Sequence, residues 1–325
     1  MKVLVTGANG FLGHRVVMEL LYRKLQVRII VRHTGDIHFD LNLVEIVVGN
    51  FTDYSNLKQA AESCDAIIHI AAVTATHLLH YSDYSKINVD GTAQVVKVAE
   101  ELKINRLVFV SSANTIGYGI EQQPGNERSV IEFPFSESFY ARSKAVAERL
   151  VKDASKKQNQ HFVIVNPSFM LGAYDPKPSS GKILIMGYKR KLLFIPKGGK
   201  NFVAVNDVAV VVCNALTMGQ NGERYLASGV NLSFKDYYTL QNQVGAYRQK
   251  IIELPDFLFI SIGKAGDLIR KAGIKTDLCS MNMQQLLVRE YYNNQKAKAD
   301  LGLPETDLKI AINEAINWFK EKKMI

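Results

Sequence analysis

The segment FYARSKAVAERL, residues 139–150, carries a tyrosine and a lysine four positions apart. In a helix, where successive residues advance by about 100°, Tyr140 and Lys144 lie on one face together with Ala147 and Val151. The arginines of the segment fall on the far side of that helix. Lys144 therefore shares its side with small and apolar residues, which is not the place of an ordinary solvated charge.

A phenol and an ammonium group at this spacing can exchange protons with a bound molecule. Free tyrosine has a pKa near 10, and a phenol that accepts protons at neutral pH needs a pKa near 7, a difference of about 4 kcal/mol. A lysine ammonium at about 4 Å contributes on that order at an effective dielectric constant near 20. We therefore expect Lys144 to lower the pKa of Tyr140. The neighbouring stripe, with Phe139, Val146 and Leu150, is expected to face the core.

A glycine-rich stretch, TGANGFLG at residues 6–13, separates a β-branched run from a helical pattern. Glycines at this point let the backbone approach a pyrophosphate, and the N-terminus of the following helix offers unpaired N–H groups and the positive end of its dipole. The spacing G-x-x-G-x-x-G departs from the common G-x-G-x-x-G pattern. We predict a dinucleotide-binding turn whose contacts are Gly7, Asn9, Gly10, Phe11, Leu12 and Gly13.

The end of the second predicted strand, QVRIIVR at residues 26–32, bears on the choice of dinucleotide. An NAD site normally offers Asp or Glu there to the ribose 2′-hydroxyl. Arg32 stands in that place, and a guanidinium can hold a 2′-phosphate through two parallel hydrogen bonds. The sequence therefore predicts NADP(H) as the preferred cofactor, with NAD(H) as the alternative. The plainer interpretation of Arg32 is a surface arginine at a strand end.

Near-continuous apolar runs recur along the N-terminal half, most of them followed by helical stretches; they lie at residues 26–32, 44–50, 65–72, 106–112 and 161–167. Such strands are buried on both faces, which predicts a parallel sheet covered by helices. We expect a Rossmann-type, doubly wound α/β domain over 1–167, rejoined by a strand and helix near 202–216. A smaller, mostly helical substrate-binding portion, 168–325, should cover the carboxyl edge of the sheet, where ligands of such sheets bind. It should include helices at 281–299 and from Thr306 onward.

Composition narrows the classes of protein further. The chain has 325 residues, 47% of them hydrophobic and 22% charged, which is typical of a globular protein. No run approaches the roughly 18 apolar residues of a membrane span, and the first strand-like run begins at Lys2, so we expect a cytoplasmic protein. The net charge of +9 comes without a basic docking motif, and we expect neither a nucleic-acid nor a membrane partner.

Other features are given structural interpretations. Three separated cysteines without CxxC spacing indicate neither disulfides nor zinc. His77 and His80 lack the acidic or cysteine neighbours of a metal site, so no metal is predicted. The tyrosines at 237–238 and the run FLFISIG at 257–263 are expected to be core of the smaller portion rather than a membrane contact. A substrate-facing apolar surface is the alternative for that run.

With the glycine loop, SSANTIGYG at 111–119 and YARSK at 140–144, the sequence resembles the extended short-chain dehydrogenase/reductase family. Within it, the chain is most similar to the dihydroflavonol-4-reductase-like branch. The resemblance covers about the first 215 residues. Further matching segments are HIAA at 69–72, NVDGT at 88–92, NPSFMLG at 166–172 and VNDVA at 205–209.

The resemblance implies roles for particular residues. Tyr140 would be the proton donor or acceptor, Lys144 its electrostatic partner and ribose ligand, and Ser112 the hydroxyl that polarises the substrate carbonyl. Ser111 and Thr115 are alternatives to Ser112. The other implied cofactor contacts are Asn50 and Phe51 at the adenine, Ala71 and Ala72 along the dinucleotide, and Pro167 and Ser168 near the nicotinamide. Asn50 and Asn206 depart from the family pattern, which often has aspartates there.

Three functions are compatible with this reading. The first is an NADPH-dependent reductase, or the reverse dehydrogenase, of a moderately hydrophobic ketone, aldehyde or hydroxysteroid-like small molecule. The second is a nucleotide-sugar epimerase or dehydratase with bound NAD, against which stand Arg32 and the absence of an asparagine after Pro167. The third is a non-catalytic NADP-binding regulator, which would commonly have lost Tyr140 or Lys144. A homodimer is an alternative to a monomer.

Overall fold

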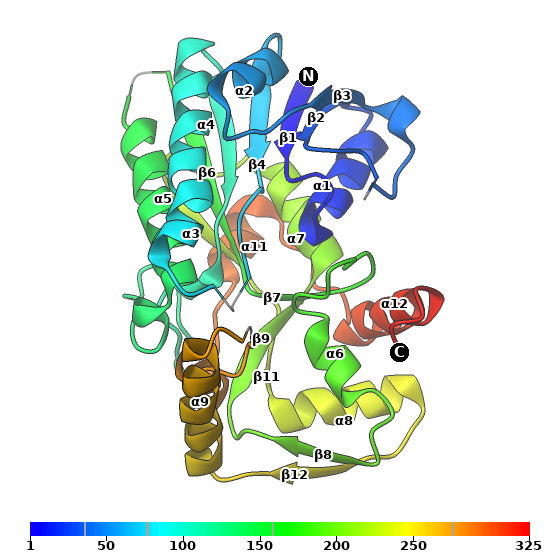
Figure 1. Cartoon of the computed structure of the whole chain (residues 1–325). Helices are drawn as coiled ribbons and strands as arrows, with labels where there is room; N and C mark the ends of the chain where they lie inside the picture. The colour runs from blue at the N-terminus through cyan, green and yellow to red at the C-terminus, as the bar shows by residue number, and fades with distance from the viewer. Residues whose placement is uncertain (36, 76–77, 158, 275) are drawn as a thin grey trace.

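Seven parallel strands form the main sheet of the computed structural model, which describes residues 1–35, 37–75, 78–157, 159–274 and 276–325 (Figure 1). Their spatial order is β10-β6-β5-β4-β1-β2-β3, and every neighbouring pair is parallel. Six of the strands are β1 (Lys2–Thr6), β2 (Gln26–Val31), β3 (Glu45–Val48), β4 (Ala66–His69), β5 (Arg106–Val110) and β6 (His161–Pro167). These confirm the predicted doubly wound fold.

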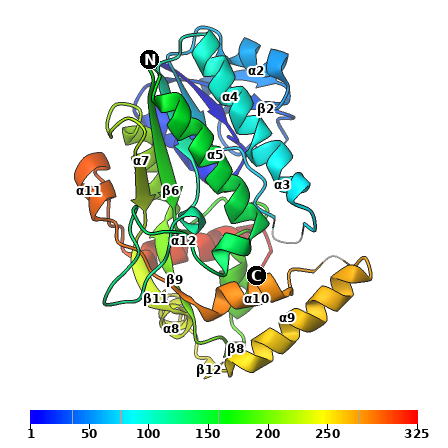
Figure 2. The ribbon, with the colours of Figure 1, turned by 90° about the vertical axis from the view of Figure 1, so that its left-hand side faces the viewer.

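Helices cover both faces of this sheet (Figures 1 and 2). One face packs against α1 (Phe11–Tyr22), α7 (Val205–Asn214) and α11 (Gln295–Leu301). The other packs against α2 (Tyr54–Ala61), α4 (Asp90–Glu101) and α5 (Phe139–Ser155), with α3 (Tyr81–Asn88) beside α4 and α5. Burial on both faces explains the continuous apolar runs of the strands.

The remainder of the chain builds a smaller part at the carboxyl edge of the sheet (Figure 1). Its first sheet contains β7 (Phe169–Leu171), β9 (Gly199–Ala204), β11 (Val230–Ser233) and β13 (Arg289–Glu290), and its second pairs β8 (Leu192–Ile195) with β12 (Lys250–Glu253). Its helices are α6 (Lys182–Gly187), α8 (Phe234–Gly245), α9 (Asp256–Lys271), α10 (Ser280–Leu287) and α12 (Leu308–Glu321). The sequence did not predict the two small sheets.

Two details of the predicted elements are wrong. The strand expected near 202 to rejoin the main sheet is β9, which pairs with β7, β11 and β13. Only α7 returns to the main sheet as expected, and the seventh strand is β10 (Arg224–Ala227), which pairs with β6. The helical stretch expected over 281–299 is interrupted by β13 and divides into α10 and α11.

The α5 helix buries a different stripe from the one expected. Its buried side contains Ala141, Lys144, Ala147 and Val151, and the last two belong to the core against the main sheet. Phe139 packs edge-on against Tyr81 of α3, with the ring centroids 6.1 Å apart. Periodicity grouped the residues of α5 into the right two stripes. The stripe with Lys144 faces the sheet, because its small alanines allow the helix to approach more closely.

The two apolar segments interpreted as core of the smaller part behave differently. Tyr237 and Tyr238 are buried, as expected. The run at 257–263 lies in α9, where Phe257 is 63% and Ile262 41% exposed. The interpretation of that run as core is therefore wrong for most of its side chains. Within the described residues, no helix combines the length and the hydrophobicity that a bilayer crossing requires.

Candidate active site

Several of the residues predicted from sequence meet at the carboxyl edge of the main sheet. Ser112 follows β5, Ala71 and Ala72 follow β4, and Pro167 ends β6. Tyr140 and Lys144 lie on the first two turns of α5, whose N-cap Ser138 accepts a hydrogen bond from the main-chain nitrogen of Ala141. The cap fixes where the helix begins, and thereby which side chains its first turns present to the strand ends.

Lys144 is the buried cation of this site. It is 1% exposed, and its Nζ donates a hydrogen bond of 2.7 Å to the main-chain oxygen of Val110 at the end of β5. The ammonium lies 4.2 Å from the ring centroid of Phe109. Burial lowers the pKa of Lys144 to about 7, while the carboxylate of Glu148 raises it. This cation therefore titrates near neutral pH, whereas an exposed lysine titrates near 10.4.

Tyr140 differs from the sequence prediction in its protonation. Burial raises the pKa of its phenol above the ordinary value of 10, and a hydrogen bond with the Ser112 side chain acts in the opposite direction. The prediction that Lys144 lowers this pKa is wrong here, because Lys144 is directed to Val110 and its own positive charge is destabilised by burial. The phenol is therefore protonated at neutral pH, as a proton donor must be.

The three candidate hydroxyls near the end of β5 differ in their hydrogen-bond partners. Ser112 interacts with Tyr140, and its Oγ also accepts a hydrogen bond of 3.2 Å from the main-chain nitrogen of Asn114. Thr115 is turned away into a buried network, with its Oγ1 2.6 Å from Oε1 of Glu148. The Ser111 hydroxyl is buried without a partner among the described residues. Ser112 is thus the one associated with the tyrosine.

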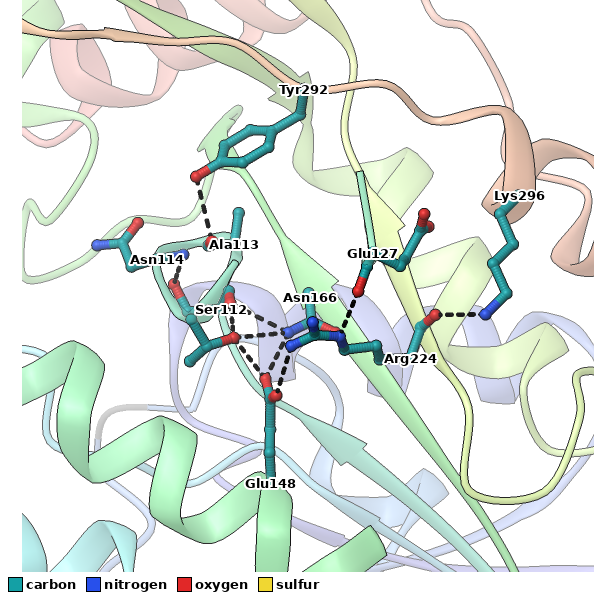
Figure 3. Close-up of polar contacts among 10 residues, drawn as sticks. Ser112, Ala113, Asn114, Glu127, Glu148, Asn166, Arg224, Tyr292 and Lys296 are labelled. Carbon is teal, nitrogen blue, oxygen red and sulfur yellow. Dashed lines mark hydrogen bonds and ion pairs between the residues drawn. The ribbon is translucent and has the colours of Figure 1, made fainter. Parts of the chain in front are cut away.

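A buried carboxylate, Glu148, holds the turn that carries Ser112 (Figure 3). Its Oε1 accepts a hydrogen bond of 2.5 Å from Nδ2 of Asn166, which also donates to the main-chain oxygen of Ser112 at 3.1 Å. Thr115 in the 3₁₀ turn η2 (Ala113–Thr115) lies 2.6 Å from the same carboxylate oxygen. Helix α5, strand β6 and the turn after β5 are therefore fixed to one another beside Lys144.

The outer side of this network extends to the last strand of the main sheet (Figure 3). Arg224 of β10 places its Nη1 3.5 Å from Oε2 of Glu148 and donates through Nε to the main-chain oxygen of Glu127 at 2.8 Å. From the segment after β13, the Tyr292 hydroxyl donates to the main-chain oxygen of Ala113 at 3.1 Å. The smaller part of the chain thus contacts the same turn.

Sequence reasoning missed Glu148, Asn166 and Arg224. A signal was present for Glu148, since it follows Lys144 by four residues and so lies on the side of the helix where an acid is as unexpected as the lysine. Asn166 and Arg224 had no such signal. The residues that they bond to lie far from them in the sequence, so the local pattern does not indicate what either side chain contacts. Only the fold brings them together.

Two further buried polar residues support the strand ends. The Asn88 side chain bonds both main-chain groups of Val73, at 2.8 and 3.1 Å, and donates to Oγ of Ser143 at 2.9 Å. His69 lies between Thr6, at 2.7 Å, and Thr92, at 3.1 Å, and burial lowers its pKa to about 3. A neutral imidazole therefore ties β4 to β1 and α4, and the loop after β4 is fixed to α5.

The glycine turn after β1 has the shape of a phosphate cradle. Gly7 adopts a φ of +78°, and a Cβ there would lie 2.7 Å from the main-chain nitrogen of Ala71. A Cβ at Gly13 would lie 1.9 Å from the Gly7 oxygen, so α1 packs directly on the loop. Gly10 is exposed at the N-cap of α1. Free N–H groups at a helix N-terminus beside an open glycine fit the pyrophosphate of a dinucleotide.

The remaining predicted cofactor residues lie around this turn. Arg32 and Asn50 are exposed just beyond β2 and β3, the two strands next to β1 on that side. Phe51 is partly buried and packs against His69, with the ring centroids 5.4 Å apart. Ser168 is committed elsewhere, since its hydroxyl donates to Oδ1 of Asn201 at 2.6 Å. Asn9 and Phe11 are partly exposed, whereas Leu12 is 4% exposed and points into the core.

The other sequence expectations concerned metals. Within the ranges that the structure describes, no group of three or more His, Cys, Asp or Glu is arranged for a metal ion. His80 is an exposed residue at the N-cap of α3. His77 lies outside the described residues.

The glycine geometry predicts that one substitution mainly affects stability and another mainly affects cofactor binding. Gly13→Ala should lower the free energy of unfolding by about 2–3 kcal/mol, because its methyl group overlaps the Gly7 oxygen. Gly10→Ala, whose methyl group would meet the Gly7 oxygen at 3.3 Å, should destabilise the fold by at most about 1 kcal/mol and weaken dinucleotide binding at least about tenfold. Urea unfolding and NADPH titration measure the two effects, and equal destabilisation by both would contradict this account.

A parallel doubly wound sheet with a glycine turn after its first strand and a Tyr–Lys pair at its carboxyl edge defines a Rossmann-type α/β protein. The model of the NAD dependent epimerase/dehydratase family matches residues 3–228, and the chain belongs to that family. The chain is 30% identical over 334 residues to a putative dihydroflavonol 4-reductase from Synechocystis sp., covering 97% of this chain and 94% of that protein. It is 28% identical over 333 residues to sterol demethylase protein B from Methylococcus capsulatus, with 100% of both chains covered.

Solved structures agree with the fold. A protein described as gox2253 has a TM-score of 0.83 at 26% identity, with 99% of each chain covered. The UDP-glucose 4-epimerase of Thermus thermophilus, in complex with NAD, has a TM-score of 0.77 at 18% identity, covering 98% of this chain and 99% of that one. With its family shown and relatives named for reductase and dehydrogenase reactions, the chain is an NAD(P)-dependent oxidoreductase of the extended short-chain dehydrogenase/reductase type. This confirms the resemblance and its dihydroflavonol-reductase-like branch.

Proposed function

We propose that this chain is an NADPH-dependent reductase, or the reverse dehydrogenase, of a moderately hydrophobic ketone, aldehyde or hydroxysteroid-like substrate. The observation that carries the proposal is Lys144, a wholly buried lysine bonded to the end of β5 and one helical turn beyond Tyr140, whose phenol is protonated and bonded to Ser112. Burying a lysine costs folding free energy, and groups with strongly shifted pKa values are typical of functional sites. Carbonyl reduction needs a proton donor, a hydrogen-bond donor to the substrate oxygen and a group that holds the cofactor. Tyr140, Ser112 and Lys144 would fill these roles.

The residues divide the chemistry as follows. The Tyr140 phenol, protonated at neutral pH, gives its proton to the substrate oxygen as negative charge develops there. Ser112 donates a hydrogen bond to the same oxygen. A bound NADPH would supply the hydride to the carbonyl carbon. The Lys144 ammonium would contact the ribose of the bound cofactor and so orient the nicotinamide.

The glycine turn would hold the pyrophosphate, and the residues after β2 and β3 would lie along the adenosine half. On this proposal Arg32 selects NADPH, because its exposed guanidinium follows the strand next to β1. Asn50 uses its side-chain oxygen to cap its own turn, accepting from the main-chain nitrogen of Thr52 at 3.2 Å. A carboxylate that would repel the 2′-phosphate is thus missing at both Arg32 and Asn50.

Arg32→Ala should reduce the ratio of kcat/KM for NADPH to that for NADH by at least about tenfold, because one charge-assisted bidentate contact is lost. The value of kcat with saturating NADPH should remain close to that of the wild type. Arg190→Ala, at another exposed arginine, is the matched control and should leave the ratio unchanged. An unaltered ratio in Arg32→Ala would show that this arginine is only a surface residue.

The proposed substrate class rests on the loops that follow β4 and β5 and on the relatives. Large apolar side chains remain exposed in the loop after β4 and in the segment between η2 and α5, namely Leu79, Ile120, Val130 and Phe133. Relatives are named for sterols and for dihydroflavonols, neither of which is a nucleotide sugar. These observations favour a hydrophobic carbonyl compound over a nucleotide sugar.

The direct test is NADPH oxidation by the purified protein with a panel of aromatic and aliphatic aldehydes, cyclic ketones and 3-ketosteroids. We expect turnover with at least one hydrophobic member and none with UDP-sugars. The protein should be isolated without tightly bound NAD. Bound NAD, with no NADPH oxidation and interconversion of nucleotide sugars, would instead establish the epimerase alternative.

A further inference from the structure

Helix α9 presents an apolar surface to solvent at one end of the molecule. Figure 2 shows it projecting from the smaller part of the chain, with α10 along its inner side. Among the helices of the described chain, α9 makes its main packing contacts with α10. Several of its large apolar side chains are exposed, including Phe257 at 63% and Leu268 at 67%.

The orientation of α9 is fixed by two glycines on its inner side. A Cβ at Gly266 would lie 1.2 Å from the main-chain oxygen of Leu278, and one at Gly263 would lie 2.7 Å from Cα of Ser280. Phe259 is buried on the same side. Because the inner side is packed this closely, the opposite side cannot turn inward to bury its apolar residues.

The outer face of α9 is nearly free of polar groups. At about 100° per residue, it covers an arc of about 140° that contains Phe257, Leu258, Ser261, Ile262, Ala265, Leu268, Ile269 and Ala272. The one hydroxyl among them, of Ser261, donates to the main-chain oxygen of Phe257 at 2.8 Å. Scattered exposed apolar residues are common, whereas a contiguous apolar face marks an interaction surface.

Charged residues follow one border of the outer face. Lys264 and Lys271 are exposed immediately beside it, where their stems can lie along apolar surface while the ammonium groups reach outward. The acids of the helix lie further round, and Asp267 is turned inward, accepting from the main-chain nitrogen of Ser280 at 3.1 Å. An apolar arc bordered by lysines is the arrangement of helices that lie in the interface of a bilayer.

We propose that the outer face of α9 docks on membrane surfaces that contain anionic lipids. The apolar side chains enter the boundary between headgroups and acyl chains, and Lys264 and Lys271 contact lipid phosphates. A helix of 16 residues is about 24 Å long, so it lies in the surface of the bilayer and does not cross it. This proposal is opposite to the expectation from sequence of a protein without a membrane partner.

Helix α9 is linked to the helices of the candidate active site through the loop before α3. Near the C-terminal end of α9, Nη2 of Arg270 donates to the main-chain oxygen of Leu78 at 3.0 Å, in the loop that leads from β4 to α3. Tyr81 of α3 packs on Phe139 at the start of α5. Membrane docking would bring the candidate active site close to substrates dissolved in the bilayer; this consequence rests on the proposed function, whereas membrane binding does not.

The test is flotation of the full chain with vesicles of phosphatidylcholine alone and of phosphatidylcholine with phosphatidylglycerol. The wild type should bind the anionic vesicles, and the double variant Phe257→Ser/Leu268→Ser should bind at least about tenfold more weakly. Leu43→Ser/Val48→Ser, at residues 59% and 66% exposed elsewhere, is the matched control and should bind normally.

A second pair of variants tests the charges. Lys264→Gln/Lys271→Gln should weaken binding to the anionic vesicles by about fivefold per lysine, whereas Lys309→Gln/Lys323→Gln, which removes the same charge from other exposed positions, should not. In a Leu268→Trp variant, tryptophan emission should shift to the blue on addition of anionic vesicles, because the new side chain enters the bilayer.

Three results would overturn the proposal. They are absence of vesicle binding by the wild type, equal binding by the Phe257→Ser/Leu268→Ser variant and its control, and a dimer in solution that this variant disrupts without any vesicle binding. The last result would assign the outer face to a second copy of the chain. None of these measurements depends on catalysis, so a failure of the proposed reductase activity would leave them interpretable.

Discussion

Tyr140→Phe should lower kcat for carbonyl reduction by about 10³-fold, because it removes the group that protonates the substrate oxygen. The phenyl ring retains the packing of Tyr140, and the helix cap at Ser138 is untouched. Dissociation constants for NADPH should therefore stay within about twofold of the wild type. Steady-state kinetics and NADPH titration of the same preparation measure the two quantities together.

The control for Tyr140→Phe is Tyr22→Phe, which removes the same hydroxyl from a tyrosine that is 84% exposed on α1. Its kcat should equal that of the wild type. A Tyr140→Phe enzyme that turns over at the wild-type rate would remove Tyr140 from the mechanism. A loss of NADPH binding in that variant would show that the phenol holds the cofactor instead of moving a proton.

Lys144→Met should lower kcat/KM for NADPH by about 10²-fold or more, because the ammonium proposed to hold the cofactor ribose and orient the nicotinamide is lost. The effect on stability has the opposite sign. Burial lowers the pKa of Lys144 to about 7 in the folded protein, so between pH 7 and about 10.4 the unfolded chain binds the extra proton. The charged lysine therefore disfavours folding most below pH 7, and the variant should not be less stable there.

The pH profile gives a second measurement on the same lysine. The value of kcat/KM for NADPH, which reports on the free enzyme, should fall as the pH rises through about 7 and Lys144 loses its proton. Glu148→Gln removes the negative charge that raises this pKa, so the fall should move to lower pH. Asp153→Asn, exposed on the same helix, is the control.

Two kinetic outcomes would contradict the role given to Lys144. One is a Lys144→Met variant that keeps its activity while Lys152→Met, at an exposed lysine on the same helix, behaves identically. The other is a profile that does not move in Glu148→Gln. Coincident loss of activity and of folding would place Lys144 in the structure alone.

Local sequence patterns predicted most strands and helices of the main sheet because its inner strands, such as β4 and β5, are buried on both faces, so their apolar composition is visible without knowing their neighbours. The same holds for Gly7 and Gly13. The tight turn leaves no room for a Cβ at either position, so glycine is required there. The association of Ser112 with Tyr140 was accessible only through the resemblance to a family, because 27 residues separate the two along the chain.

Other features depended on the packing of distant segments. Periodicity divides α5 into stripes but does not say which stripe meets the sheet, and small residues such as Ala147 decided it. The exposed run in α9 was predicted to be core because it is hydrophobic. Hydrophobicity alone does not show whether another element packs against a segment. The pKa of Tyr140 followed burial, whereas spacing to Lys144 suggested the opposite direction.

The measurement that tests the central claim most directly is the transfer of deuterium from NADPH labelled at C4 of the nicotinamide, followed by mass spectrometry of the alcohol product. We predict one deuterium at the former carbonyl carbon with the wild type and at least about 10²-fold slower labelling with Tyr140→Phe. An alcohol formed without the label, or a protein that transfers no deuterium to any carbonyl compound while interconverting nucleotide sugars on its own bound NAD, would contradict the account.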